Sequence, residues 1–438
     1  MTRVILYTGK GGVGKTSIAA ATALAASRRG LRTVVLSTDS AHSLGDSFDL
    51  ELTPEPTLIA ERLWAQECDV YFNMEKYWGT VQRWMESLLA WEGFNRALAD
   101  EMVVLPGMDE LASLLWILEH QRSGQYDLVV VDCAPTAETF RLLSFPEAGR
   151  WWLEKIFPVS RRVSGLARPL LKRLTSMPLP DDSVFEATRD LMARIEEIQA
   201  VLADPTTTSV RLVTNPERMV IKETQRAYTL LGLYGYLADL VVCNRVLPAE
   251  AFEGSYFAAR AADQERYLAQ IDDLFSPVPL KFARQFDREL VGFDALAALA
   301  ESLFGDEDPT QFYYDRPPFQ VRSVTPGDAS DADSAVPEAT QYELKLTIPF
   351  VEREGLELVT VGEELVLEAG RHRRNMLLPR VLQSRPVLGA RMRGGTLHVW
   401  FGGRDRCTNR NASPSWRAVS QNSSESSMSH QWRGYSRL

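Results

Sequence analysis

Short apolar runs alternate with alanine-rich or amphipathic segments through the first part of the chain. Val4–Thr8 and Thr33–Thr38 are mostly aliphatic and of strand length, which is typical of parallel strands buried on both faces. Between them, Ser17–Arg29 has a helical period and ends at Gly30. A strand, a helix and a strand within about 35 residues predict a βαβ unit and hence a parallel sheet.

Later runs continue this sheet. The further strands are expected at Leu128–Asp132, Val210–Thr214, Leu240–Asn244 and Val278–Phe282. A helix is expected near Arg218–Leu231, and Ala249–Phe304 is mostly helical. Two segments, about 58–122 and 147–204, lack strand signals and predict helical insertions. The fold class over residues 1–304 is therefore α/β, with a doubly wound, mostly parallel sheet.

The pattern changes after residue 304. Residues 305–341 are rich in glycine, aspartate, serine and proline, which favours a flexible linker. Residues 342–401 show short alternating runs separated by glycine and predict a small β-sandwich. The segment 402–438 lacks periodicity and predicts disorder, although its abrupt change in composition fits a shifted reading frame equally well.

Composition narrows the classes of protein. Of the 438 residues, 45% are hydrophobic and 24% are charged, as in ordinary globular proteins. The net charge of −10 disfavours nucleic acid and anionic membranes as partners. The four cysteines, Cys68, Cys133, Cys243 and Cys407, form no CxxC motif that would indicate a metal site. Without a signal-peptide pattern or an apolar stretch of spanning length, we expect a cytoplasmic protein with no integral membrane segment.

A phosphate-binding motif follows the first strand. The chain reads GKGGVGKT from Gly9 to Thr16, matching G-x-x-x-x-G-K-[ST] between a strand and a helix. The predicted nucleotide-binding residues are Gly9, Lys10, Gly11, Gly12, Val13, Gly14, Lys15, Thr16 and Ser17. Lys15 is expected to reach the β- and γ-phosphates, and the Thr16 hydroxyl to hold Mg²⁺. ATP and Mg²⁺ are thus the expected cofactors.

Two carboxylates end strands on the same edge of the predicted sheet. Asp39 follows the second strand, where it can orient the attacking water and approach the metal ion. Asp132 ends the third strand, as a carboxylate bound to Mg²⁺ or to its water would. The plainer alternatives are a helix cap for Asp39 and a turn former for Asp132.

Three segments read TGKGGVGKT, TDSAHS and DCAPTAETFRLL. Together they resemble the ArsA/Get family of ATPases over about residues 1–304. That family includes arsenite-pump ATPases and ATPases that target tail-anchored proteins. The sequence departs from the family pattern at Ser40, Cys133, Ala137 and Glu138, which leaves both carboxylates intact.

The resemblance implies roles for further residues. Lys10 matches the second lysine of the deviant Walker A loop, which acts across a homodimer on the partner's nucleotide. Asn244 resembles the asparagine that reads adenine, although a strand-end turn residue is the plain alternative. Pro279 is expected beside the same ring, and Glu217 near the partner's nucleotide.

Residues 342–401 resemble the α-crystallin fold, through LTIPF, GEELVLEAG and GGTLHVWF. The helical insertions contain amphipathic stretches that, in the resembling family, form a groove for apolar polypeptides; ordinary packing between helices is the alternative. The leading hypothesis is a dimeric, ATP-driven chaperone or targeting factor. A catalytic subunit of arsenite efflux and a positioning ATPase similar to MinD and ParA are the alternatives. Whether a membrane-associated partner takes part stays open.

Overall fold

A computed structural model gives the fold of the chain. It describes residues 1–38, 43–69, 72, 79–80, 83–84, 86–87, 108–133, 182–252, 258–324, 340–351, 356–361, 364–369, 372–379, 381–383, 385–403, 415–417 and 433–435. These residues form two compact units, which we describe separately. The first contains residues 1–224 and 238–315, and the second contains residues 225–237 and 316 onward.

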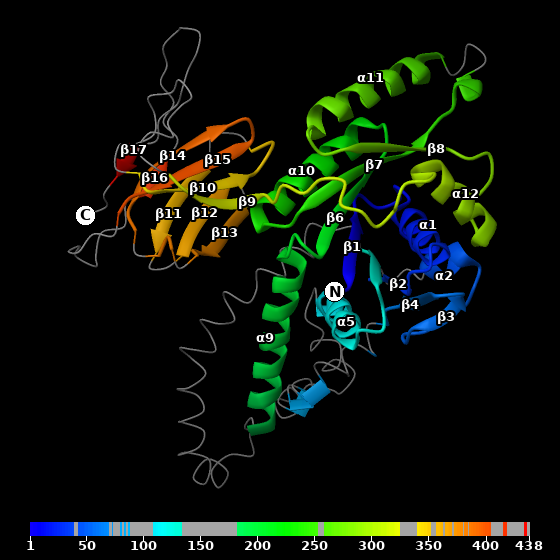
Figure 1. The fold of residues 1–438 in the computed structure, drawn as a ribbon, viewed down its shortest axis with the longest axis horizontal. Helices are drawn as coiled ribbons and strands as arrows, with labels where there is room; N and C mark the ends of the chain where they lie inside the picture. The colour runs from blue at the N-terminus through cyan, green and yellow to red at the C-terminus, as the bar shows by residue number, and fades with distance from the viewer. Residues whose placement is uncertain are drawn as a thin grey trace. The chain divides into compact units, whose positions relative to one another are not determined.

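The first unit is built on one sheet of eight strands in the order β3-β4-β2-β5-β1-β6-β7-β8 (Figure 1). The strands are β1 (Arg3–Thr8), β2 (Thr33–Ser37), β3 (Thr57–Ala60), β4 (Leu63–Glu67), β5 (Leu128–Asp132), β6 (Thr208–Thr214), β7 (Ala238–Val246) and β8 (Leu280–Arg284). Neighbours are parallel except for β3 and β4. The predicted doubly wound, mostly parallel sheet is confirmed. The strands β2 and β5 lie on one side of β1, and the later strands β6, β7 and β8 lie on its other side. The direction in which the chain adds strands to the sheet therefore reverses beside β1.

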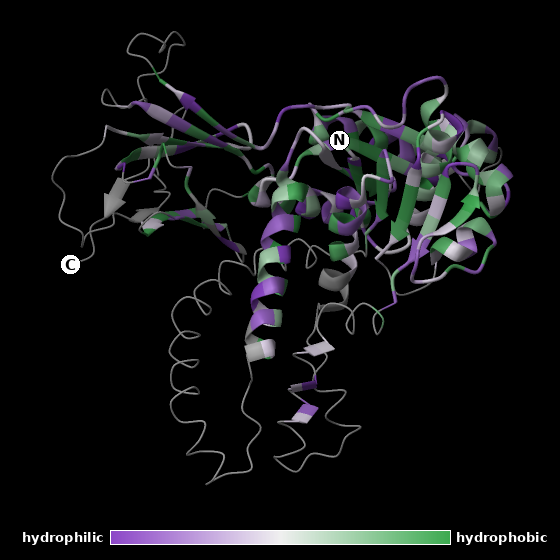
Figure 2. Cartoon of the chain, turned by 60° about the horizontal axis from the view of Figure 1, so that its bottom comes forward, coloured by the Kyte–Doolittle hydropathy of each residue, from purple (hydrophilic) through white to green (hydrophobic). Residues whose placement is uncertain are grey.

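Helices cover this sheet. They are α1 (Lys15–Arg28), α2 (Ser43–Phe48), α5 (Met108–Ser123), α9 (Asp182–Ala203), α10 (Arg218–Tyr234), α11 (Ala258–Phe275) and α12 (Gly292–Phe304), with the 3-10 helix η2 (Ala249–Phe252). Most of the small residues of α1 are fully buried against the sheet and α12. Alanine suits this position because it lets the backbones approach closely. Figure 2 shows the strands mainly in green, whereas α9 alternates between purple and green along its length.

The prediction of a helical insertion from residue 58 is wrong for β3 and β4. The run LWAQE holds only five residues, too few to show a period, and its strand character depends on parallel pairing with β2. The helices α5 and α9 agree with the prediction for their parts of the two insertions. The amphipathic stretches expected to bind clients, residues 151–157 and 165–174, lie outside the described residues.

The second unit contains two antiparallel sheets, ordered β14-β15-β10-β9 and β13-β12-β11-β16-β17. The strands are β9 (Phe319–Ser323), β10 (Tyr342–Thr347), β11 (Leu356–Val361), β12 (Glu364–Ala369), β13 (His372–Leu377), β14 (Val387–Arg393), β15 (Thr396–Phe401), β16 (Ser415–Arg417) and β17 (Arg433–Tyr435). The central strands bury aliphatic side chains, including Leu344, Leu346, Leu358, Leu367 and Val399. The predicted β-sandwich is confirmed.

Two predictions for the C-terminal region need correction. β9 lies within the segment 305–341 expected to be a linker, and it pairs with β10. Flanking prolines and acidic residues hid the alternation of FQVRS in the sequence. β16 and β17 lie within 402–438, expected to be disordered, and β16 pairs with β11. Short strands of this kind have no signal of their own, because the partner strand supplies their hydrogen bonds.

The second half of helix α10 belongs to the second unit. The Thr229 hydroxyl donates to the carbonyl of Pro349, and Tyr228 packs on Phe350 with ring centroids 6.2 Å apart. A Cβ at Gly232 would lie 2.1 Å from the carbonyl oxygen of Thr347, so only glycine fits there. A helix that lies between β6 and β7 in the chain therefore packs against the strands of the sandwich.

Candidate nucleotide site

The loop from Gly9 to Gly14 joins β1 to α1 at the carboxyl edge of the sheet. Gly14 is left-handed, with φ of 91°, and a Cβ there would lie 2.3 Å from Nδ2 of Asn244. The same Nδ2 donates to the carbonyl of Val13 at 2.8 Å. Asn244, near the carboxyl end of β7, is thus held directly against the loop. The structure brings these two predicted parts of the site together.

The two lysines of the loop have different environments. Lys15, the first residue of α1, is 6% exposed, and its Nζ donates to the carbonyl of Lys10 at 3.5 Å. Its ammonium group is therefore held against the loop that would cradle phosphates. The Lys10 side chain is partly exposed. Lys15 has the position of a cation for the nucleotide of its own chain, whereas Lys10 is accessible from outside.

A hydroxyl and a carboxylate meet below the loop. The Thr16 hydroxyl donates to Oδ2 of Asp132 at 2.6 Å and lies 3.3 Å from the hydroxyl of Ser43 on α2. Asp132 ends β5, the strand paired with β1, and is 1% exposed. Mg²⁺ prefers oxygen ligands and usually takes one or two protein groups together with water and phosphate oxygens. The pair Thr16 and Asp132 fits such an ion.

Replacing Asp132 with asparagine should lower ATPase activity by about 10–100-fold and raise the Mg²⁺ concentration needed for half-maximal rate. The amide keeps the shape of the side chain but loses the charge that favours the cation. The measurement is a Mg²⁺ titration of ATP turnover. Asp127→Asn is the matched control, because this carboxylate precedes the same strand and forms an exposed pair with Arg32. An unchanged Mg²⁺ requirement in Asp132→Asn would contradict the assignment.

The buried cysteines have a structural character. Cys133 is 1% exposed, its amide donates to the carbonyl of Tyr7, and burial raises the pKa of its thiol well above the ordinary value. Burial also raises the pKa of Cys243 to about 12. Both thiols are therefore neutral. Among the described residues, no group of three or more His, Cys, Asp or Glu side chains could hold a metal ion.

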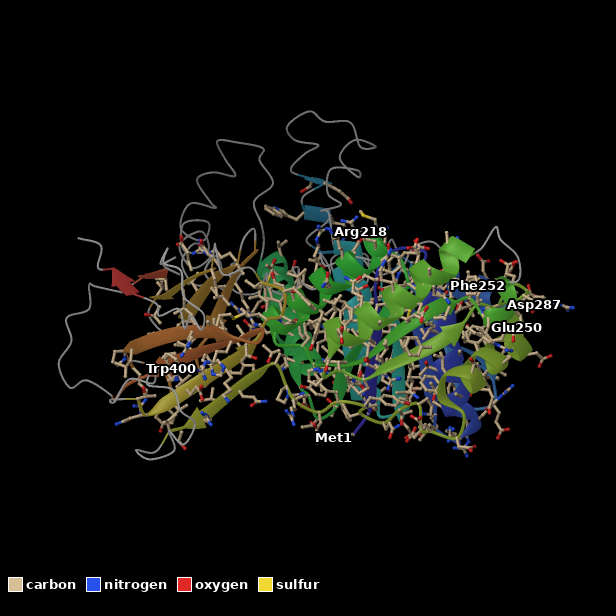
Figure 3. All side chains as sticks on the ribbon, turned by 90° about the horizontal axis from the view of Figure 1, so that it is seen from above. Met1, Arg218, Glu250, Phe252, Asp287 and Trp400 are labelled. Carbon is tan, nitrogen blue, oxygen red and sulfur yellow. The ribbon has the colours of Figure 1, made fainter. Side chains whose placement is uncertain are left out.

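A cleft of about 340 Å³ opens beside Gly14 and Ser17. Its other walls are Asp46 and Ser47 of α2, Asn244 and Arg245 of β7, and residues 284–286 and 288–291 at the end of β8 and after it. Figure 3 labels Asp287 within this last segment. We call this space the base-side cleft, after the role that the sequence analysis expects for Asn244, which lines it. Residues 284–291 and Asp46 were missed in the sequence analysis. The rule that ligands bind beyond the carboxyl ends of strands would have indicated the loop after β8.

The structure places Pro279 elsewhere. It precedes β8, and its carbonyl accepts a hydrogen bond from the amide of Val241 at 2.9 Å. Since β8 runs parallel to β7, this is the amino end of the strand, opposite the loop that lines the base-side cleft. The structure therefore does not bring Pro279 together with Asn244; residues that follow β8 line the cleft beside Asn244 instead.

Glu217 lies at the carboxyl end of β6, in a second cleft of about 960 Å³. This cleft shares Arg245 and Gln285 with the base-side cleft, and Asn215, Arg260 and Tyr267 also line it. Glu217 is thus on the correct edge of the sheet but in a neighbouring cleft.

Asp39 lies outside the described residues, as do Ser40, Ala137 and Glu138. The preceding Thr38 is fixed by its amide, which donates to the carbonyl of Asp132 at 2.9 Å.

A glycine-rich loop between a strand and a helix, a buried lysine, and a carboxylate on the adjacent strand define a P-loop nucleotide hydrolase. Residues 2–305 match the sequence model of the family described as anion-transporting ATPase, ArsA. Residues 339–401 match the HSP20-like domain found in ArsA. The chain belongs to the ArsA ATPase family and carries its α-crystallin-like domain.

Several curated proteins are similar to most of the chain. An arsenical pump-driving ATPase of Prosthecochloris vibrioformis is 39% identical over 405 residues, covering 91% of this chain and 96% of that protein. An arsenical pump-driving ATPase of Aquifex aeolicus is 36% identical over 394 residues, covering 87% and 95%. The ATPase ASNA1 homolog 1 of Paramecium tetraurelia is 29% identical over 315 residues, covering 70% and 94%. ATP hydrolysis is the activity these names share.

No helix among the described residues combines the length and the hydropathy needed to cross a bilayer.

Proposed function

We propose that the chain is a Mg²⁺-dependent ATPase that works as a homodimer and couples its nucleotide state to the binding and release of apolar polypeptide segments. The observation that carries this proposal is the loop with two lysines, of which Lys15 is buried against the loop and Lys10 is accessible. The family to which the chain belongs supports the hydrolysis of ATP.

The proposed chemistry follows from the positions of Lys15, Thr16 and Asp132, together with the place of Asp39 in the sequence. Lys15 stabilises the charge on the β- and γ-phosphates, and the backbone amides of the loop hold the phosphate oxygens. Thr16 and Asp132 would hold Mg²⁺, and the bound ion would supply positive charge at the transferred phosphate. Asp39 orients the attacking water. Positioning and electrostatic stabilisation supply most of the rate in phosphoryl transfer, so no covalent step on the protein is needed.

The homodimer completes each site. Lys10 of one subunit adds a cation at the transferring phosphate of the other, in the manner of an arginine finger. Glu217 lies near the nucleotide of the partner in the same assembly. The support for this arrangement is that Lys10 begins the loop on its accessible side while Lys15 already serves the nucleotide of its own chain.

A polypeptide client fits the chain better than a metalloid. A metalloid site needs grouped thiolates, and the described cysteines Cys68, Cys133 and Cys243 are buried and separate. The raised pKa of Cys133 and of Cys243 keeps both thiols protonated. The α-crystallin-like domain adds antiparallel strands whose edges can pair with extended peptides.

Stimulated turnover distinguishes the candidate functions. We expect an apolar helical peptide to raise the ATPase rate of the full chain by about fivefold or more, the scale of a coupling free energy near 1 kcal/mol. A peptide of equal length with charges on its apolar face is the matched control. Arsenite should have no effect. Stimulation by arsenite and not by the peptide would favour efflux, and nucleotide-dependent binding to lipid vesicles alone would favour positioning.

A further inference from the structure

The segment that follows β2 is flanked by two buried carboxylates. In the sheet, β2 lies between β4 and β5, and its last residue, Ser37, pairs with Glu67 on one side and with Asp132 on the other. Both carboxylates therefore lie at the carboxyl edge, level with the start of the loop that carries Asp39. The proposed function uses Asp132 and assigns no role to Glu67.

Each carboxylate-bearing residue fixes one end of this segment. On the β5 side, the amide of Thr38 donates to the carbonyl of Asp132 at 2.9 Å. On the β4 side, Oε1 of Glu67 accepts a hydrogen bond from the amide of Gly45 at 2.8 Å. Gly45 lies in the first turn of α2, where backbone amides lack partners within the helix. Glu67 is 5% exposed, so little water competes with its oxygen for the Gly45 amide.

Helix α2 contributes to both ends of the nucleotide site. At the metal end, the Ser43 hydroxyl lies 3.3 Å from that of Thr16. At the other end, Asp46 and Ser47 line the base-side cleft. The apolar face of the helix is buried through Leu44 and Phe48 in the core that includes α1 and α12. A displacement of the first turn of α2 would therefore change the surroundings of Thr16.

We propose that Glu67 is a positioning residue for ATP hydrolysis, which holds the first turn of α2 so that the Ser43 hydroxyl stays beside that of Thr16. Glu67 acts through this helix and contacts no reacting atom. The inference rests on the proposed ATPase activity. It assigns to Glu67 a role that depends on where its oxygen lies rather than on its charge.

Two conservative variants separate position from charge. Glu67→Gln keeps an oxygen at the same distance along the side chain, and should retain kcat within about threefold. Glu67→Asp keeps the charge but withdraws the carboxylate by one carbon–carbon bond, roughly 1.5 Å. It should lower kcat at least ~10-fold, because misplacement of about 1 Å near reacting groups has effects of that size or larger. KM for ATP should change by less than about threefold in both. Glu61→Gln, in the exposed turn before β4, is the matched control.

A second measurement does not depend on turnover. Amide hydrogen exchange of residues 43–50 in the full chain should be faster in Glu67→Asp than in the natural chain, and unchanged in Glu67→Gln. If aspartate retains more activity than glutamine, if both lose it equally, or if exchange is the same in both, the inference is overturned. Should the natural chain hydrolyse no ATP, the proposed function fails, while the order of exchange rates still decides whether Glu67 holds α2.

Discussion

Lys15→Ala should lower kcat/KM for ATP by at least ~10²–10³-fold, the usual loss when one preorganised group that stabilises transition-state charge is removed. Lys15 is buried at the start of α1, with its ammonium group held against the loop by the carbonyl of Lys10. In such a site little solvent screens the charge, so its interaction with phosphate is stronger than at a surface. Steady-state turnover and binding of a fluorescent nucleotide measure the effect.

A matched control separates this loss from a loss of folding. Lys281 is also a partly buried lysine in the first unit, paired with Glu307 at 3.0 Å. Lys281→Ala should leave nucleotide binding within about threefold while removing a lysine of comparable exposure. If a folded Lys15→Ala chain hydrolysed ATP at the rate of the natural chain, the phosphates would have to be bound elsewhere.

Lys10→Ala should bind ATP and yet hydrolyse it ~10³-fold or more slowly, the range seen when a cation supplied across an interface is lost. Asp39→Asn should also bind ATP and hydrolyse it slowly, since it loses the group that orients water. Neither variant alone forms a complete site in a homodimer. The substitutions should therefore change the rate of hydrolysis more than the affinity for ATP. Titrations of nucleotide binding and of turnover, made on the same variants, measure the two effects.

Mixing the two variants tests whether Lys10 acts across the dimer. In a heterodimer, the Lys10→Ala subunit keeps its own Asp39 and receives Lys10 from its partner, so one complete site forms. With free exchange of subunits, the mixture should regain about a quarter of the natural rate, because half of the dimers have one of two sites intact. Proven exchange without a gain would place Lys10 in the site of its own chain. Constant specific activity down to nanomolar protein, with no dimer detected, would remove the interface.

The parts of the site that the sequence predicted share a local signal. The loop around Lys15 is a contiguous motif, and Asp132 ends a run of buried aliphatic residues. Because β1 and β5 are parallel, the direction of these strands is enough to place both parts at the carboxyl edge of the sheet. The base-side cleft has no such signal, because α2, β7 and the loop after β8 are far apart in the sequence. Pro279 was misplaced because a proline beside a strand does not reveal which end of that strand faces the ligand.

Some strands could not be recognised from the sequence, because their formation depends on pairing with a neighbouring strand. The run containing Glu67 includes polar residues, and it is recognisable as a strand only when it is placed beside β2. The sequence pattern does not distinguish a buried glutamate in such a run from a solvent-exposed one. In an alternating strand, polar residues are expected on one face whether that face is buried or exposed. Its hydrogen bond to Gly45 joins segments 22 residues apart, and the tertiary structure alone reveals it.

The close contact at Gly232 has a consequence for comparing members of this family. A glycine inside a helix costs about 0.5–1 kcal/mol relative to alanine, so selection should remove it wherever nothing presses on the helix. Here the carbonyl of Thr347 occupies the space of a side chain. ATPases of this family that lack the sandwich have no such neighbour, and this position is free to carry a larger residue. The amino acid at this one helical position should therefore sort the lineages that acquired the appended domain from those that did not.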